Sequence, residues 1–447
     1  TGLKTRHLTM MGLGSAIGAG LFLGTGVGIQ AAGPAVLLAY LAAGIIVVLV
    51  MEMLGEMAAA RPSSGSFSTY SKQAFGHWAG FTMGWLYGFM VILVGGSEMT
   101  GAAAIMGGWF GVDPWIPALV CVVFFAVVNF AQVRGFGEFE FWFAFIKVAV
   151  IIGFLLIGVA LVFGWLPGVE PVGLTNFLGE DGFMPNGWPG LAAGLLAVAF
   201  AFGGIELVTI AAAESEKPSQ AIGVAVRSVI WRIAVFYIGS VLVITLLLPY
   251  DQLGAAETAA ESPFTAVLGM ADLPGVVGFM EAVIVLALLS AFNAQIYGTS
   301  RLVHSLALDR DAPRIFAVTN RDSVPINAVV LSMFFAFASV GLQYWNPEGL
   351  LTFLLNAVGG CLIVIWIMIT ASYLRLHPQL EDLGEISTVR MWGWPWLGWA
   401  TMIALWSLVA LMLFDAAARS QIIAVVVVTA VLVGLASLTK WGQGRVS

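Results

Sequence analysis

The sequence predicts an all-helical membrane protein with twelve transmembrane helices, two of them broken. Three observations support this prediction. First, 60% of the 447 residues are hydrophobic, only 10% are charged, and the mean hydropathy is +0.97, which together exclude an ordinary soluble protein. Second, apolar runs of bilayer-spanning length recur along the whole chain. Third, lysine and arginine gather in alternate loops between those runs.

The apolar runs are separated by proline, glycine or clusters of charge, which set their approximate ends. They lie at about 9–30, 34–58, 78–109, 113–133, 137–165, 188–213, 225–249, 274–305, 326–344, 349–374, 394–414 and 420–440. The third and eighth runs are longer than a bilayer requires, so we expect these helices to be tilted or to extend into water.

The basic residues give the orientation of the helices. If the N-terminus is cytoplasmic, 16 of the 18 Lys and Arg residues fall in cytoplasmic segments, as the positive-inside rule requires. Arg419 falls outside, and Lys147 lies within the fifth run. The loops around 166–187 and 250–273 carry acidic residues and no Lys or Arg. We therefore expect those loops outside and both termini in the cytoplasm.

Glycine interrupts the first run. It recurs there at Gly12, Gly14, Gly18, Gly20, Gly24, Gly26 and Gly28. Glycine weakens a helix, and a broken helix in lipid is tolerated only where its freed N–H and C=O groups meet protein, water or a ligand. We therefore interpret Ala16-Ile17-Gly18-Ala19-Gly20 as a break that faces a cavity. Close packing between helices, which also favours small residues, is the alternative.

A second break is expected at Phe200-Ala201-Phe202-Gly203-Gly204-Ile205-Glu206, about 185 residues later. Paired interruptions in corresponding segments of two halves point to the substrate site of a secondary transporter. Runs one to five (9–165) and six to ten (188–374) each begin with a broken helix, and an odd number of spans makes the two copies insert with opposite orientation. We therefore expect one transporter domain over 1–447, with the helices of 394–440 appended.

The two breaks suit a zwitterionic ligand. A broken helix offers unpaired N–H groups at the start of one half and unpaired C=O groups at the end of the other. The amides of Ala19 and Gly20 are candidates for a carboxylate, and the carbonyls of Ala16 and Gly203 for an ammonium group. Neither contact needs a charged side chain.

Three ionisable residues stand deep within apolar runs. Lys147 by default marks an ion or proton pathway, although a lysine can also snorkel to the interface. Glu98 and Glu206 are expected to face the bundle interior, where either could bind the amino group of a substrate or carry a proton. Structural hydrogen bonding is the alternative for both carboxylates. Glu52 and Glu56 are expected to form a charge cluster with Arg61 instead.

Four further residues are candidates for supporting roles. Phe200 and Phe202 flank the second break, where an aromatic ring could cover a bound substrate or simply pack. Ser290 and Asn293 place polar groups on the eighth run, opposite Lys147 in one interpretation and in ordinary core hydrogen bonds in the other.

Enzymes and ATP-driven pumps are disfavoured. The four histidines lie near the ends of runs, Cys121 and Cys361 have no partner spacing, and the chain has no Walker-type glycine loop. We expect no catalytic residue, no metal site and no disulfide. A channel or receptor that merely binds its ligand stays open, and saturable accumulation against a gradient distinguishes it from a carrier.

Five sequence motifs, spread over nearly the whole chain, match a known family of proteins. They are Gly14-Ser15-Ala16-Ile17-Gly18-Ala19-Gly20-Leu21-Phe22, Gly55-Glu56-Met57-Ala58 followed by Pro62-Ser63-Ser64-Gly65-Ser66-Phe67, the second break, Glu214-Ser215-Glu216-Lys217-Pro218, and Ser300-Arg301 with Asp309-Arg310-Asp311-Ala312-Pro313. In place and order they resemble the amino acid, polyamine and organocation transporter superfamily. Within it the chain is similar to bacterial amino acid permeases, most of all to actinobacterial aromatic amino acid permeases.

The resemblance implies a LeuT-type five-plus-five inverted repeat in the bacterial cytoplasmic membrane. It implies proton-coupled import of amino acids by alternating access, with Phe, Tyr and Trp as favoured substrates. GABA, proline or another small neutral amino acid, and amino acid exchange, remain alternatives. The expected partners are the amino acid and membrane lipid, without nucleic acid, cofactor or a coupling ion other than the proton. The protein is expected to be a monomer or weak dimer.

The resemblance also assigns roles to individual residues. Lys147 stands where sodium-driven relatives bind an ion, and Phe200 matches the gating aromatic. The residues matching those that contact the backbone of the substrate are Ala16, Ala19, Gly20, Phe200 and Gly203. Ala19 replaces a serine common at its position, so its amide alone remains for the carboxylate. Room for a bulky side chain is expected beside Gly95, Gly96, Gly359 and Gly360, unless these glycines serve packing.

Overall fold

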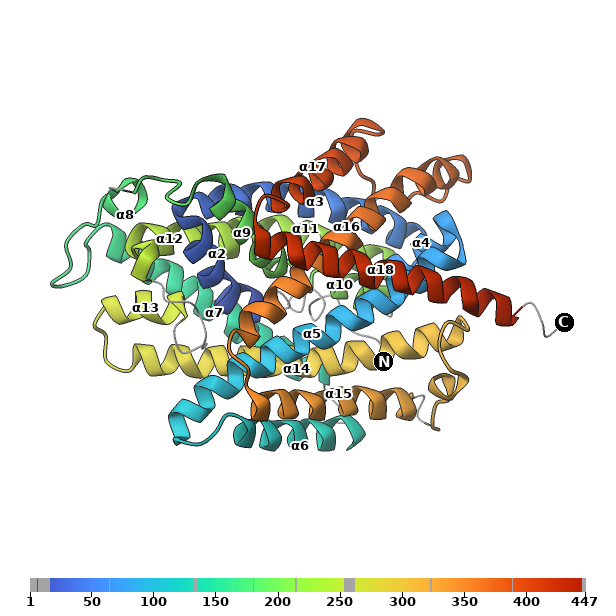
Figure 1. The fold of residues 1–447 in the computed structure, drawn as a ribbon, viewed down its shortest axis with the longest axis horizontal. Coiled ribbons are helices and arrows are strands. Elements are labelled where there is room, and N and C mark those ends of the chain that lie inside the picture. The colour runs from blue at the N-terminus through green and yellow to red at the C-terminus, as the bar shows by residue number, and fades with distance from the viewer. Residues whose placement is uncertain are drawn as a thin grey trace.

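A computed structural model describes residues 6, 17–63, 65–131, 136–179, 181–213, 215–252, 262–321, 324–387 and 389–443. Within these ranges every regular element is a helix, as the sequence predicts. Most of the long helices run along the long axis of the molecule (Figure 1).

The first half of the chain contains η1 (Gly20–Gly24), α2 (Thr25–Ala32), η2 (Gly33–Ala35), α3 (Val36–Ala60), α4 (Phe67–Phe75), α5 (His77–Phe110), α6 (Trp115–Ala131), α7 (Phe136–Val162) and α8 (Thr175–Leu178). The middle contains α9 (Gly187–Ala201), α10 (Leu207–Ala213), α11 (Pro218–Trp231), η3 (Arg232–Gly239), α12 (Ser240–Leu247), η4 (Tyr250–Gln252) and α13 (Pro263–Met270). The rest contains α14 (Val276–Leu308), η6 (Arg314–Ala317), α15 (Ile326–Trp345), α16 (Leu350–Asp382), α17 (Trp396–Met412) and α18 (Ala416–Gln443).

Eight stretches of the described chain are long and apolar enough to cross a membrane. They are Gly20–Ala60, His77–Phe110, Phe141–Val162, Pro218–Leu247, Val276–Leu308, Ile326–Trp345, Leu350–Asp382 and Ala416–Thr439. Shorter apolar helices occupy Trp115–Phe130, Gly187–Ala201 and Trp396–Met412. A helix therefore lies at every predicted run, although the first two runs join into one stretch and the sixth ends early because it breaks.

The outer faces of the bundle are apolar. Within Ala416–Thr439, only 17% of the most apolar 18-residue segment is buried inside the protein. The corresponding share within Phe141–Val162 is 28%. The outward side chains of these helices include Leu156, Val426 and Val431, each more than half exposed. Such surfaces are stable only in a hydrocarbon surrounding, so the protein is a membrane protein with several apolar spans.

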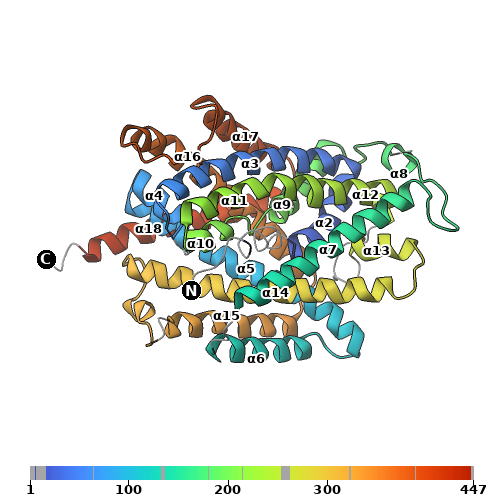
Figure 2. The same cartoon turned by 180° about the vertical axis from the view of Figure 1, so that it is seen from behind.

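The core is built around α5, which packs along α14 and against α4 and α16. In Figure 1, α6 and α15 form a pair at one edge of the molecule, and these two helices are in contact. From behind, α11 runs beside α3, and α7 crosses the bundle near α14 (Figure 2). Helices α2 and α9 likewise pack against each other.

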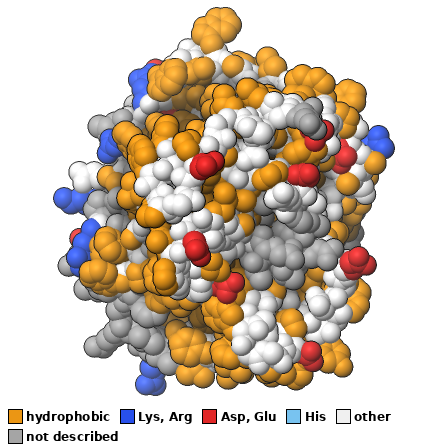
Figure 3. Space-filling view, turned by 90° about the vertical axis from the view of Figure 1, so that its left-hand side faces the viewer, with side chains coloured by type: hydrophobic (Ala, Val, Ile, Leu, Met, Phe, Trp, Pro, Cys, Tyr) orange, Lys and Arg blue, Asp and Glu red, His pale blue; other side chains and the backbone are white. Residues whose placement is uncertain are grey.

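The end of the molecule that carries α8 and α13 is acidic. Asp and Glu side chains are spread over this face, and Lys and Arg are visible only at its rim (Figure 3). This distribution matches the predicted acidic loops at 166–187 and 250–273.

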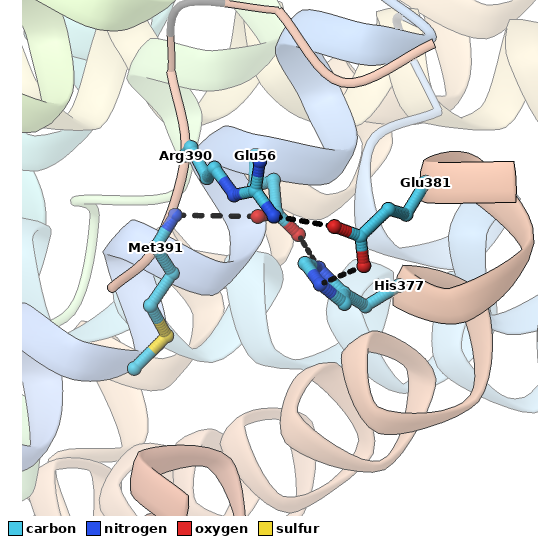
Figure 4. A network of polar contacts seen from close by, with 5 residues as sticks. All are labelled: Glu56, His377, Glu381, Arg390 and Met391. Atoms are coloured by element: carbon cyan, nitrogen blue, oxygen red, sulfur yellow. Dashed lines mark hydrogen bonds and ion pairs between the residues drawn. The ribbon is translucent and has the colours of Figure 1, made fainter. Parts of the chain in front are cut away.

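At the opposite end, a polar network joins α3, α16 and the segment that follows α16 (Figure 4). Glu56 is fully buried, and its Oε2 lies 2.7 Å from Nδ1 of His377, which is also fully buried. Its Oε1 accepts the N–H of Met391 at 3.2 Å. Arg390 donates to Glu381 at 2.6 Å. The network therefore fastens the segment around residue 390 across two helices.

The predicted charge cluster of Glu52, Glu56 and Arg61 is wrong in its pairing. Glu56 bonds to His377, and Arg61 forms an ion pair with Glu385. Arg61 stands after the end of α3, where the backbone turns away from the helix axis, so its side chain reaches the segment after α16 instead of Glu56. Sequence spacing alone does not reveal such a contact, because the partner is more than 300 residues away.

Candidate functional site

The first predicted break lies at the edge of the described chain. Ile17 and Gly18 form a turn, and from Gly20 the chain continues as a π-helical segment, η1. Ala16 lies outside the described residues. The segment from Ile17 to Gly24 is buried throughout, so its irregular backbone faces protein and not lipid.

The second predicted break is present in the structure. Helix α9 ends at Ala201 and α10 begins at Leu207, with turns between them. Gly204 has a φ of +90°, a backbone conformation that residues other than glycine adopt only with strain. The sequence therefore places this interruption correctly, and Gly204 supplies the backbone freedom that it needs.

The two breaks meet in space. A Cβ added to Gly20 would lie 2.9 Å from the Cα of Ala201 and 3.1 Å from the carbonyl oxygen of Phe200. These neighbours are backbone atoms that cannot move aside cheaply. Glycine at position 20 therefore allows the first segment to cross the end of α9 at backbone distance.

A cavity lies at this crossing. Its lining comes from the first segment, α5, the second break and α14, through Gly18, Gly20, Tyr87, Met90, Val94, Glu98, Phe200, Gly203, Gly204 and Gln295. The space measures about 20 Å³, which is room for about one water molecule. In this conformation the helices are therefore closed around the site, and a larger ligand requires them to separate.

Glu98 occupies the amide that the sequence analysis offered to a substrate carboxylate. Its Oε2 accepts the backbone N–H of Ala19 at 3.1 Å, and the side chain is only 4% exposed. A Cβ added to Gly18 would lie 3.0 Å from Oε1 of Glu98. The small residue at position 18 therefore lets the carboxylate reach the start of η1.

Lys147 belongs to the same charged group. Its side chain is 6% exposed on α7, and its ammonium attracts the Glu98 carboxylate electrostatically. The structure thus brings together two of the three ionisable residues that the sequence analysis singled out.

Glu206, the third, is the last residue of the second break and does not line the cavity. Trp366 of α16 donates its Nε1–H to Oε1 of Glu206 at 3.1 Å. Arg232, the first residue of η3, is 1% exposed and attracts the same carboxylate. The sequence analysis missed Arg232 as a site residue by counting it with the cytoplasmic charges. Its place inside the run 225–249, between Trp231 and Ile233, was the available signal.

The two predicted aromatic residues point to different places. Phe200 lines the cavity. Phe202 is fully buried beside Tyr40 and Tyr237, with ring centroids 5.9 Å and 4.9 Å away, and it does not line the cavity. Phe200 lies in α9 and Phe202 keeps helical backbone angles, and residues two apart on a helix point to nearly opposite sides. One ring therefore faces the cavity and the other the core.

Three polar residues of α14 are buried, but only one of them lines the cavity. Asn293 accepts a hydrogen bond from Asn129 at 2.9 Å, and Ser290 is 9% exposed. Neither lines the cavity, whereas Gln295, which the sequence analysis did not select, does.

The four glycines expected to leave room fall into two pairs. Gly359 abuts the backbone carbonyl of Leu196, and a Cβ on Gly360 would lie 2.8 Å from Val425, so both serve close packing. Gly95 and Gly96 have no atom nearer than 3.7 Å to an added Cβ. They border a second small space of about 30 Å³, and this space shares Gln295 with the central cavity.

Among the described residues, no group of three or more His, Cys, Asp or Glu side chains is arranged to hold a metal ion.

Comparison with known proteins places the chain among transporters. A family model described as amino acid permease matches residues 7–442. The aromatic amino acid transport protein AroP of Corynebacterium glutamicum is 73% identical, over 98% of this chain and 95% of that protein. The gamma-aminobutyric acid permease of Bacillus subtilis is 40% identical, over 96% and 91%.

Among solved structures, a manganese transporter of Eremococcus coleocola superposes with a TM-score of 0.59 at 13% identity, over 99% of this chain and 95% of that one. At that identity the likeness concerns the fold alone. The family model and the two relatives span almost the whole sequence, and the chain therefore belongs to the amino acid permease family.

Proposed function

We propose that this protein imports aromatic amino acids together with protons by alternating access. The observation that carries the substrate class is the 73% identity to a protein named as an aromatic amino acid transporter, over nearly the full length of both chains. The cavity at the meeting point of two broken helices is where a secondary transporter binds its substrate.

The proposed architecture is a LeuT-type inverted repeat of five plus five helices, with helices one and six broken and two helices appended. Support comes from the helices at all twelve predicted runs and from the fold likeness to a solved transporter. The proposed orientation has both termini in the cytoplasm of a bacterial cell, which agrees with the acidic face of Figure 3 being external.

The substrate is proposed to lie with its backbone groups between the two breaks. Its carboxylate binds the amides at Ala19 and Gly20, and its ammonium group meets the carbonyls around Phe200. Its ring extends towards Gly95 and Gly96, which leave space beside α5. Phe200 covers the site from one side.

Proton coupling is proposed to work through Glu98. Without substrate, the Glu98 carboxyl group accepts the N–H of Ala19, and the charge of Lys147 acts on it. A proton on Glu98 removes the negative charge from that amide, so the carboxylate of the amino acid can take its place without repulsion. Proton and substrate then enter together because each favours the binding of the other.

A second candidate substrate is GABA or another small neutral amino acid, which the 40% identity to a gamma-aminobutyric acid permease favours. The reconstituted protein distinguishes the two. Labelled phenylalanine uptake under an inward proton gradient should be competed by tryptophan and tyrosine, and not by GABA, proline or lysine. Competition by GABA would move the substrate to the small amino acids, and uptake indifferent to the gradient would favour exchange.

A further inference from the structure

A groove of about 380 Å³ lies between α5, α15 and α16. Helices α15 and α16 both pack against α5 (Figure 1), and α5 contributes Ile92 and Gly96 to the lining of the groove. From α15 the lining includes Ala338, Gly341 and Trp345, all of which are exposed on the outside of the bundle. Sites that hold small molecules measure about 300–1,000 Å³. The groove is therefore open to the surroundings of the protein and large enough for a ligand.

The lining of the groove is apolar. Apart from Ser339 and Trp345, its residues are Ala, Gly, Ile, Leu and Phe. Ser339 donates its hydroxyl hydrogen to the carbonyl of Ala336 on its own helix. A polar ligand would lose its hydrogen bonds with water and gain few in return, which is costly. The groove therefore suits a hydrocarbon.

The surface around the groove faces lipid. Phe334 of α15 is 65% exposed, and Phe353 of α16 is 56% exposed. Apolar side chains of this size are stable in such positions only within the hydrocarbon of a bilayer. An empty groove would leave the atoms of its lining without contact partners. The surrounding hydrocarbon is therefore the occupant that the groove meets and fits.

The length of the groove matches one leaflet of a bilayer. Its lining on α15 extends from Phe335 to Trp345, which is about 15 Å at the helical rise per residue. The hydrocarbon core of a bilayer is about 30 Å thick. Trp345 ends α15 beside the exposed Tyr344, and such aromatic residues are enriched at the membrane–water interface. The groove thus runs from the interface to the middle of the bilayer, as the acyl chain of a lipid does.

The inner end of the groove adjoins the substrate site. Gly96, Phe335 and Ser339 line both the groove and the small space of about 30 Å³. Gln295 lines that small space and the central cavity. The groove, the small space and the central cavity therefore lie in series from the lipid to the substrate site.

We propose that the groove between α5, α15 and α16 binds one acyl chain of a membrane lipid. The end of the chain lies at Gly96, where it closes the lipid-facing side of the space that the substrate ring occupies. The binding of the chain does not depend on the proposed transport of aromatic amino acids. Its effect on the ring rests on that function.

Photochemical labelling tests the occupant. The native protein is reconstituted with phosphatidylglycerol that carries a diazirine in the middle of one acyl chain, and the adducts formed on irradiation are mapped by mass spectrometry. Adducts on residues of the groove should exceed those on the lipid-facing side of α18 several-fold. Equal labelling of the two surfaces would overturn the proposal. Displacement of the groove adducts by excess phenylalanine would also overturn it, because the groove would then take the substrate.

Two glycines provide a matched pair of variants. A Cβ on Gly341, or on Gly434 of α18, would meet no atom within 4 Å, and both positions are exposed. Gly341→Phe places a ring in the groove and should reduce the groove adducts several-fold, whereas Gly434→Phe should leave them unchanged. Ala338→Leu fills the same groove with a smaller side chain and should act in the same direction. Undiminished adducts in both groove variants would refute the bound chain.

Uptake tests the effect of the chain on the substrate site. The KM for phenylalanine is compared in bilayers of dioleoyl and diphytanoyl phosphatidylglycerol, because methyl branches make the phytanoyl chain wider. It should differ several-fold between the lipids for the native protein and Gly434→Phe, and little for Gly341→Phe, whose own ring fills the groove. An equal change in all three proteins would reject the closing role of the chain. Absence of uptake in every lipid would contradict the proposed transport and leave the labelling result standing.

Discussion

Glu98 on α5 and Ala19 in the first segment are joined by a hydrogen bond of 3.1 Å, from the backbone N–H of Ala19 to Oε2 of Glu98. The bond ties the broken first helix to a different part of the bundle, 79 residues away in sequence. It also places a carboxyl group on the amide that the substrate carboxylate would use under the proposed mechanism. The proposed coupling therefore links amino acid binding and the protonation of Glu98 at one backbone N–H.

Replacing Lys147 should weaken coupling. Lys147→Gln removes the positive charge that balances Glu98, so the carboxylate takes up a proton more readily and loses it less readily at the cytoplasmic side. We expect gradient-driven uptake to fall by about tenfold or more, equivalent to roughly 1.4 kcal/mol. Labelled phenylalanine uptake into proteoliposomes measures this. Lys147→Arg, which keeps the charge, is the control, and full uptake in Lys147→Gln would exclude the lysine from coupling.

Gly20→Ala should disrupt the crossing of the two broken segments. The new methyl group would meet the backbone of Phe200 and Ala201, and overpacking of this kind costs about 1–3 kcal/mol. We expect a lower unfolding temperature and little uptake. Gly108→Ala on α5 meets no atom within 4 Å and should behave like the native protein. Equal stability of the two variants would show that the crossing tolerates a side chain.

Glu56→Ala should destabilise the protein at the end opposite the acidic face. The change leaves His377 and the N–H of Met391 without their buried acceptor, and each buried polar group left unsatisfied costs about 1–3 kcal/mol. Thermal unfolding in detergent measures the effect, with the exposed Glu348→Gln as control. A loss no larger than that of the control would mean that the network of Figure 4 contributes little.

The ion pair of Arg61 and Glu385 should give a stability contribution that is lost in acid. The Arg61 guanidinium lowers the pKa of Glu385 below its ordinary value of 4.5. A carboxyl whose pKa is lower in the folded state stabilises that state fully above its unfolded pKa, and the contribution disappears as the pH falls through the lowered value. Glu385→Gln should therefore be less stable than the native protein at pH 7 and equally stable in strong acid. A difference that persists in acid would point to packing.

Much of the fold can be predicted from the sequence because a membrane-spanning helix is recognised by the length and hydropathy of its apolar segment. Helix α14 at Val276–Leu308 matches the predicted run 274–305 closely. The break between Ala201 and Leu207 is also predicted, since the Gly203-Gly204 pair lowers the stability of the helix. Lipid offers no hydrogen bonds to the freed backbone groups, so such a break points to the protein interior.

The site is less predictable from the sequence because the sequence alone does not show which face of each helix is turned towards the cavity. Phe200 and Phe202 look equivalent in the sequence, yet only Phe200 lines the cavity. Gln295 lies two residues from the predicted Asn293, which bonds to Asn129 instead.

Arg232 was missed for another reason. The positive-inside rule treats every arginine near the end of a span as a topological signal. A buried arginine and an interfacial one look alike until the neighbouring helices are known.

Substrate-driven proton movement tests the central claim most directly. Proteoliposomes carrying a trapped pH dye are given phenylalanine without a proton gradient, and the internal pH is followed for the native protein and for Glu98→Gln. The account predicts internal acidification with the native protein, and none with Glu98→Gln even where that variant still exchanges internal for external phenylalanine. Equal acidification in both, or phenylalanine entry without acidification in the native protein, would contradict it.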